Sequence, residues 1–173
     1  MDLNMPHNNI NTRETLVAYL NNLNIGVLST IRPNGTPYSA VVYFVVDHSL
    51  NFYFLTKSDT KKSDNLQKNN NASFTTIDLT SMITVQSTGT VEKVIDPEQH
   101  TYMIKSIGEA NARKNNPQWP PPISKLQSIG DNIVYKYKPN WLRVGDYSHK
   151  LASEQNAQKE ESIFTEFIPQ QKT

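Results

Sequence analysis

Short β-rich segments separated by turn signals constrain the fold of this chain more than any other feature. IGVLSTI (25–31) and TPYSAVVYFVV (36–46) are rich in β-branched and aromatic residues, and they flank a Pro-Asn-Gly turn signal, which predicts a hairpin. The polar stretch DHSLN predicts a second reversal before FYFLT (52–56). We therefore expect an antiparallel meander of three strands.

Two more strands are expected after a polar segment. ASFTTIDL (72–79) and MITVQSTGTVEKV (82–94) have strand composition, and Gly89 lies where a β-bulge would interrupt the second. Strands at such short spacing need closure to remove their exposed edges. The sequence therefore predicts a mainly β fold with some helix, of the α+β class, built on a barrel or curled sheet.

Helices are expected at marked places beside these strands. NTRETLVAYLNNL (11–23) carries apolar residues at helical spacing, with Asn11 as its N-cap and Glu14 as the capping-box partner. DPEQHTYMIKSI begins another helix, with Asp96 as the N-cap and a proline at the first helical position. The proline-rich PQWPPP (117–122) predicts a loop or a rigid linker after it.

The C-terminal part predicts two final strands and a tail. NIVYKYKP (132–139) and WLRVGDY (141–147) have strand composition, and the chain becomes polar after them. SIFTEF (162–167) could form an added edge strand or a partner-docking arm. We expect a single domain over residues 1–147 and a polar tail over 148–173.

Length and composition exclude several classes of protein. The 173 residues suffice for one domain, and a net charge of +1 gives no electrostatic reason to expect a nucleic-acid partner. The absence of cysteine excludes disulfides and thiolate metal sites and is typical of intracellular proteins. The N-terminus is too polar for a secretory signal, and the longest apolar run, Ala40–Val46, is too short to span a membrane. We expect a cytoplasmic protein without a membrane partner.

No catalytic motif made of side chains is visible. The histidines at positions 7, 48, 100 and 149 have no metal-ligand spacing, and none accompanies a serine in a nucleophile-elbow pattern. The acidic residues form no recognisable carboxylate pair, and there is no Walker loop or GxGxxG. If the chain is an enzyme, a bound cofactor supplies the chemistry.

Adjacent lysines at the start of an expected helix are the strongest site signal. In FLTKSDTKKSDNL (54–66), the hydroxyls of Thr56 and Thr60 and the ammonium groups of Lys61 and Lys62 surround a helix N-terminus, which already attracts phosphate. Positive charge in the first turn is unfavourable for the helix dipole, which favours a ligand as its reason. The alternative is that the lysines are a solvated helix face.

The order of these segments resembles the flavin-binding split barrel of the pyridoxamine 5'-phosphate oxidase-like superfamily, over roughly residues 12 to 147. The resemblance is carried by IGVLSTIRPNGTPYSAVVYFVVD, then NFYFLTKSDTKKSDNLQKNNNASFTTID, then ITVQSTGTVEKV. It implies a Greek-key antiparallel split barrel that binds FMN, with a homodimer in which FMN lies at the subunit interface and a small-molecule substrate.

The resemblance also implies a role for each part of the site. The backbone of Ser39 to Tyr43 would lie against the flavin ring, with Val41 and Val42 at its edge, although plain core packing explains both valines equally well. The phosphate would be bound by Leu55, Thr56, Thr60, Lys61 and Lys62. Thr84 and Gln86 fall where the family places a side-chain amide from the neighbouring subunit, and we expect strand register to decide which of the two faces the ring.

Trp141 and Arg143 are further candidates in KPNWLRVGD. They would border the flavin or substrate pocket, with Arg143 making a bidentate contact with an anion. Alternatively, Trp141 is an aromatic side chain that plugs the barrel, and the aliphatic part of Arg143 covers apolar surface. The C-terminal signature by which true pyridoxamine-phosphate oxidases hold substrate phosphate is absent. The family therefore fits the fold and the flavin better than it fits vitamin B6.

Three functions remain open on the sequence. The first is an FMN-dependent oxidoreductase acting on an unidentified small molecule, and the second is a non-catalytic flavin- or haem-binding module, as a sensor or store. The third is a structural barrel with a vestigial pocket. A haem would need an axial ligand such as His149, and a deazaflavin's acidic tail would need more positive charge than this nearly neutral chain carries.

Overall fold

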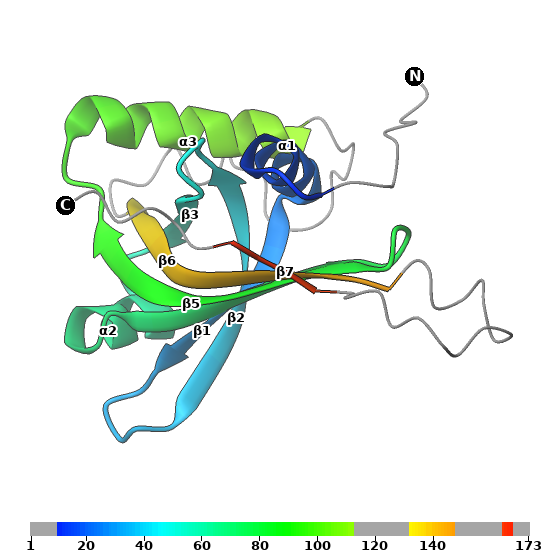
Figure 1. Ribbon diagram of the computed structural model, residues 1–173. Coiled ribbons are helices and arrows are strands. Elements are labelled where there is room, and N and C mark those ends of the chain that lie inside the picture. The colour runs from blue at the N-terminus through cyan, green and yellow to red at the C-terminus, as the bar shows by residue number, and fades with distance from the viewer. Residues whose placement is uncertain (1–9, 113–131, 148–163, 168–173) are drawn as a thin grey trace, which may run out of the picture.

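The computed structural model describes residues 10–112, 132–147 and 164–167 (Figure 1). Seven strands and three helices lie within these ranges. In chain order they are α1 (Arg13–Leu23), β1 (Ile25–Ile31), β2 (Pro37–Val46), β3 (Phe52–Lys57), α2 (Lys61–Lys68), β4 (Asn71–Asp78), β5 (Ile83–Lys93), α3 (Pro97–Ala112), β6 (Asn132–Asp146) and β7 (Phe164–Phe167).

Six of the strands close into an antiparallel barrel. The order is β3-β2-β1-β4-β5-β6, and β6 returns to pair with β3. The first half of β6 pairs with β3, from Asn132 to Tyr137, and its second half pairs with β7, from Leu142 to Gly145. The expected α+β barrel and split-barrel fold are confirmed, and β7 lies on the edge of β6 that β3 leaves open.

Aromatic side chains fill the barrel. Phe44, Phe52 and Phe74 are at most 1% exposed, and their ring centroids lie 4.8 to 5.5 Å apart. Helix α1 adds Leu16 and Leu20, both fully buried, to the same cluster. Burial of apolar surface of this extent is the main force that holds such a fold together.

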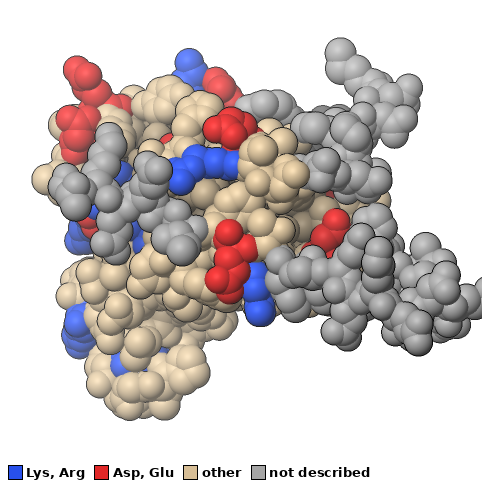
Figure 2. Space-filling model, viewed as in Figure 1, with Lys and Arg blue, Asp and Glu red and all other residues tan. Residues whose placement is uncertain are grey.

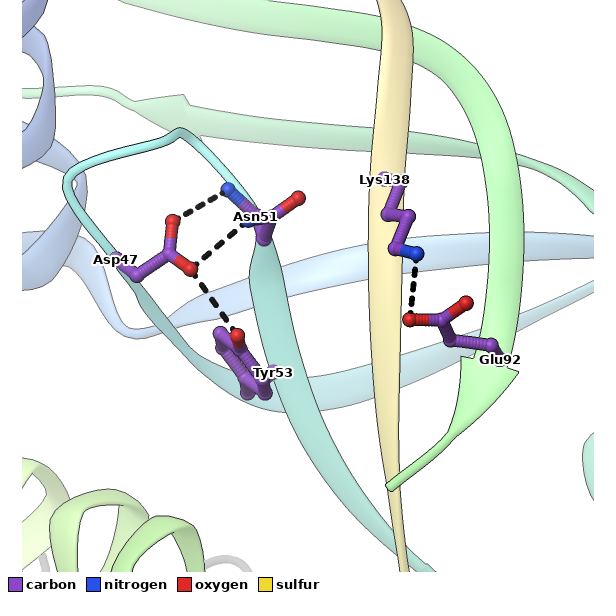
Figure 3. Close-up of polar contacts among 5 residues, drawn as sticks. All are labelled: Asp47, Asn51, Tyr53, Glu92 and Lys138. Carbon is purple, nitrogen blue, oxygen red and sulfur yellow. Dashed lines mark hydrogen bonds and ion pairs between the residues drawn. The ribbon is translucent and has the colours of Figure 1, made fainter. Parts of the chain in front are cut away.

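The turns that connect the first strands have the expected chemistry. Gly35 has φ of 81°, a conformation that favours glycine, and it completes the turn between β1 and β2. In the next turn the Asp47 carboxylate accepts hydrogen bonds from Asn51 and from the Tyr53 hydroxyl at 2.9 to 3.0 Å (Figure 3). It also accepts from the backbone N–H of Ser49 at 2.8 Å. These bonds fix the register of β2 against β3.

The N-cap expected for α1 is wrong by one residue. Thr12, with extended backbone, is the N-cap, and Thr15 is its capping-box partner, in place of Asn11 and Glu14. The Thr12 hydroxyl accepts from Thr15 N–H at 3.2 Å, and the Thr15 hydroxyl accepts from Thr12 N–H at 3.2 Å. Two threonines three residues apart therefore close the box, because each side-chain oxygen reaches the other's backbone.

The expectation of two separate final strands is also wrong, because β6 runs without a break. Pro139 lies opposite Gly89 of β5, where the register shifts after Thr88. The extra residue is Asn140 of β6, which has no partner in the register with β5. The bulge disturbs the ladder beside Pro139, which has no N–H to donate to it. The irregularity predicted at Gly89 is confirmed as a register shift after Thr88, although the extra residue lies on β6. Asp96 is confirmed at the start of α3, where it accepts from the Gln99 N–H at 2.7 Å.

Some sequence predictions lie outside the described residues. These are the PQWPPP loop, His149 and the boundary of the polar tail, of which only β7 is described. Within the described ranges, no helix is long and apolar enough to cross a membrane. The cytoplasmic location and the limits of the single domain stay predictions.

We predict that Gly89→Ala destabilises the fold by about 1 to 3 kcal/mol, the usual range for overpacking. A Cβ at Gly89 would overlap the backbone carbonyl of Lys138, and backbone in the middle of β6 cannot move aside without disturbing the ladder. Urea denaturation followed by circular dichroism measures the loss. The control is Thr88→Ala at an exposed neighbouring position, for which a comparable loss would contradict this explanation.

Candidate functional site

The passage from β3 into α2 is organised by two threonine hydroxyls. Thr60 is the N-cap of α2, and its hydroxyl donates to the Lys57 carbonyl at 3.0 Å and lies 3.0 Å from the Thr56 hydroxyl. It also accepts from the Ser63 N–H at 3.4 Å. The helix start predicted at the lysines is therefore present, with both predicted hydroxyls joined to each other beside it.

The adjacent lysines point in different directions. Neighbouring positions on a helix project roughly 100° apart. Lys61 is exposed, whereas Lys62 is half-buried, and burial lowers the pKa of its ammonium group. The burial of a lysine without a carboxylate partner within the described residues is costly, so an anion at this position would relieve it.

A cavity of about 400 Å³ lies beside α2. Lys61, Asn65 and Lys68 line it from the helix, and Arg32 and Pro33 line it from the turn after β1. Sequence reasoning did not place Arg32 or Lys68 at the site, because they are brought to it only by the packing of α2 against the hairpin. The Asn65 side chain holds this arrangement by donating to the Thr30 hydroxyl at 3.0 Å.

The predicted ring-binding strand presents alternate residues to the outside. Ser39, Val41 and Tyr43 lie on the outer face of β2, and Val41 is 61% exposed, while Val42 is buried in the barrel core. Burial raises the pKa of the Tyr43 hydroxyl. Of the two valines, then, only Val41 offers its side chain to a ligand on the outer surface.

The end of β3 supplies the remaining predicted residues of this group. Thr56 is buried, and Leu55 is half-buried against the small cluster under α3 that contains Tyr53, Val94 and Met103. Leu55 therefore packs between the barrel and α3. Thr56 contributes to the candidate site through the hydrogen bond between its hydroxyl and the Thr60 hydroxyl. The β2, β3 and α2 residues form a first group of site residues on one side of the barrel.

A second group forms on β5 and β6. The Arg143 guanidinium donates to the Gln86 side-chain oxygen at 3.0 Å and lies over the Trp141 ring, 5.5 Å from its centroid. The structure therefore brings Gln86, Trp141 and Arg143 together. The expectation that register would choose between Thr84 and Gln86 is wrong: residues two apart in a strand share a face, and both are half-buried on the outside.

Sequence reasoning missed Glu166 in this second group. The Trp141 indole N–H donates to the Glu166 carboxylate at 3.3 Å, and Glu166 lies opposite Arg143 in the ladder between β6 and β7. A strand at 162–167 was considered from the sequence, but its partner strand and register carry no local signal. Strand β7 thus adds an acidic side chain beside a predicted anion contact.

The two groups occupy one row of the sheet but are widely separated. Strand pairing aligns Val41, Val27, Thr75, Gln86, Arg143 and Glu166 across six strands. Val41 and Gln86 are three strand spacings apart, about 14 Å at 4.8 Å per spacing. One chain therefore presents two separate groups of candidate site residues on the outer surface of its sheet.

The described residues offer little to a metal. Within residues 10–112, 132–147 and 164–167, no group of three or more His, Asp or Glu side chains is arranged to hold a metal ion. Their chemistry is instead that of hydroxyls, ammonium groups, an amide and a guanidinium. This donor set suits an organic anion or a polar ring.

Comparison with known structures shows the same fold in proteins of low sequence identity. A conserved hypothetical protein from Mycobacterium tuberculosis matches with a TM-score of 0.67 and 20% identity, over 88% of this chain and 94% of that one. The haem storage protein HutZ from Vibrio cholerae matches with a TM-score of 0.58 and 17% identity, over 73% and 89%. An F420 reductase matches with a TM-score of 0.55 and 21% identity, over 72% and 93%.

The sequence itself identifies the family. No curated protein matches the chain. The family model described as pyridoxamine 5'-phosphate oxidase matches residues 12–141, which include α1, the six barrel strands up to Trp141 and both groups of predicted site residues except Arg143. The chain belongs to the pyridoxamine 5'-phosphate oxidase-like family.

Proposed function

We propose that this chain is an FMN-dependent oxidoreductase that acts on a small molecule as a homodimer. The observation that carries the proposal is the division of the site into two groups on one sheet face. Within one chain they are about 14 Å apart, too far to contact the same part of one flavin ring. A second copy related by a two-fold axis would place the second group of one subunit over the first group of the other.

An exposed apolar patch on the same face supports the dimer. The outer patch consists of Ile25, Val27, Val41 and Ile77, which are 39% to 61% exposed. Val27 and Val41 are paired in the ladder of β1 and β2, so the patch is contiguous across neighbouring strands. Apolar groups gathered on one face and rimmed by polar residues are typical of interaction surfaces.

The first group fits the phosphate end of FMN. Thr60, Lys61 and Lys62 would bind the phosphate, since this helix start combines backbone N–H groups with two ammonium groups. The half-buried Lys62 would regain there a counter-charge that the described residues do not provide. The backbone from Ser39 to Tyr43 would lie along the ring edge.

The second group fits the other side of the ring. Gln86 and Arg143 are already joined by a hydrogen bond, and the guanidinium lies over Trp141, so little conformational freedom is lost when a ligand binds. A bound flavin would supply the hydride transfer, and the protein would orient it and exclude water from it. The Glu166 carboxylate beside Trp141 makes this half of the site less favourable for an anionic substrate than Arg143 alone would be.

A haem-binding function has weaker support. HutZ is described as a haem storage protein, and it shares this fold. Within the described residues, histidines stand at 48, exposed in the turn after β2, and at 100, whose Nε2 lies 3.2 Å from the Asn132 carbonyl. Neither lies on β2, β3, α2, β5 or β6, the elements that carry the two groups of the site.

Two measurements test the proposed function. The absorption spectrum of the purified protein, with the mass of the ligand released on denaturation, should identify FMN; a Soret band would favour haem. Anaerobic mixing with NADH or NADPH should then bleach the flavin. If the flavin-loaded protein oxidises neither pyridine nucleotide and turns over no compound in a substrate screen, it is a binding module.

We predict that Lys61→Ala and Lys62→Ala each weaken FMN binding by roughly ten- to a hundredfold. Charge-assisted hydrogen bonds to phosphate contribute about 1.5 to 3 kcal/mol each, and about 1.4 kcal/mol corresponds to a tenfold change. Isothermal titration of flavin-free protein measures the effect. Riboflavin lacks the phosphate, so its weak binding should not change, and equal FMN affinity in the double variant would refute the site.

The lowered pKa of Lys62 predicts a pH dependence. Burial lowers the pKa of Lys62, so the group loses its proton at a lower pH than an exposed lysine, and FMN affinity should fall as the pH rises through the alkaline range. Arginine stays protonated throughout this range. Lys62→Arg should therefore flatten the pH profile of the dissociation constant, and an unchanged profile would mean that Lys62 does not contact the phosphate.

The dimer is tested at the outer patch. Val41→Glu should yield a monomer with little bound FMN, because it places a charge in an apolar interface. Light scattering at micromolar concentration, with flavin content from absorbance, measures both. Ile95→Glu is the matched control, since Ile95 is 90% exposed and precedes α3; a wild-type monomer with stoichiometric FMN would contradict the proposal.

A further inference from the structure

The buried face of α2 is mainly polar. Figure 2 shows Lys and Arg side chains at the surface on the side of the molecule where α2 and the β1–β2 hairpin lie. The buried side chains of the helix are Ser63, Asn65 and Leu66, each at most 6% exposed. A helix of eight residues is unstable alone, and one buried leucine gives it little apolar packing. Its position therefore depends on the hydrogen bonds of its two buried polar side chains.

Ser63 joins the first turn of α2 to β6. Its side-chain oxygen lies 2.9 Å from the Tyr135 hydroxyl, and the two residues are 0% and 2% exposed. Its backbone N–H donates to the hydroxyl of Thr60, the N-cap, at 3.4 Å. Because Ser63 and Tyr135 are both buried, they cannot contact a ligand at the surface themselves. They can act on one only through the position of α2.

Asn65 joins the same helix to β1 and β2. Its side-chain N–H donates to the Thr30 hydroxyl at 3.0 Å, and that hydroxyl donates to the Tyr38 carbonyl at 3.3 Å. Asn65 is 4% exposed and Thr30 is 1% exposed. Tyr38 directly precedes the segment that would lie along the flavin ring. A buried chain of hydrogen bonds therefore connects the helix proposed to hold the phosphate to the strand proposed to hold the ring.

We propose that Tyr135 and Thr30 are positioning residues for the flavin phosphate. Through their buried hydrogen bonds to Ser63 and Asn65, they fix the start of α2 at the distance from β2 that FMN spans. The inference rests on the proposed function, in which this helix start binds the phosphate. A binding group needs support that holds it to within about 0.5 Å, and buried hydrogen bonds provide such support.

The preference for FMN over riboflavin tests this role. Tyr135→Phe and Thr30→Val each remove a hydroxyl and nearly conserve the shape of the side chain. Each should weaken FMN binding by about three- to tenfold, the factor that corresponds to one net hydrogen bond. Riboflavin has no phosphate to be misplaced, so its binding should change less than twofold, whereas loss of structure would weaken both. Isothermal titration of flavin-free protein measures both affinities.

Tyr137→Phe is the matched control. Tyr137 also lies on β6, is 0% exposed and donates to a buried serine at 2.9 Å, but that serine is Ser87 of β5. This variant should lose stability as Tyr135→Phe does and change FMN affinity less than twofold. Equal losses of FMN affinity in the two phenylalanine variants would overturn the proposal.

A double variant separates positioning from the effect of an unsatisfied buried group. Ser63→Ala combined with Tyr135→Phe removes both partners, so neither hydroxyl is left alone. Its FMN affinity should equal that of Tyr135→Phe, because both variants break the same hydrogen bond. Recovery of wild-type affinity in the double variant would show that the bond itself does not position the phosphate site.

Hydrogen exchange keeps the inference distinct from the proposed function. If the wild-type protein binds no flavin, the proposed function fails, and exchange of the backbone amides of residues 64–69 in the ligand-free protein decides whether Tyr135 positions α2. Tyr135→Phe should accelerate this exchange by about fivefold and Tyr137→Phe by less than twofold, because local opening of α2 becomes easier only in the first. Equal exchange rates in the two variants would contradict the positioning role.

Discussion

The pairing of β6 with three different strands is the constraint on which the rest of this structure depends. β6 pairs with β5 along its length, with β3 in its first half and with β7 in its second. The strand must bend between these halves, and the bulge where Gly89 faces Pro139 allows it to bend. Without that bend, β6 could not close the barrel against β3 and also pair with β7 beside Trp141 and Arg143.

Closure determines where a ligand can bind. Phe44, Phe52, Phe74 and Tyr137 pack within the barrel, so its interior is a filled core. The site therefore has to lie outside, and the strand ladder places its residues in rows across the outer face. The row from Val41 to Arg143 is fixed by backbone pairing and extends over four strand spacings, about 19 Å at 4.8 Å per spacing. The proposed dimeric site rests on sheet geometry more than on any single side chain.

Local patterns predicted local features well and long-range features poorly. The hairpin at Gly35, the irregularity at Gly89 and the helix beginning at Lys61 each follow from residues within a few positions, and the structure has all three. The continuity of β6 was missed, because Pro139 reads as a strand breaker until its partner Gly89 is known. Glu166 was missed because no local signal reports the register of β7. Residues of one site that lie on strands distant in sequence can be identified only once the pairing of the strands is known.

Net charge is a poor guide to the ligands of this chain. Its value of +1 gives no sign of a basic site, yet three basic residues and one acidic residue line the cavity beside α2. At physiological ionic strength charges are screened beyond about 8 Å, so a bound anion interacts mainly with the side chains around it. The acidic residues that balance the total include Glu92, which pairs with Lys138 at 2.6 Å (Figure 3), and Glu109, which lies near Lys105 on α3. Because they do not line the cavity, they do little to reduce its attraction for a phosphate.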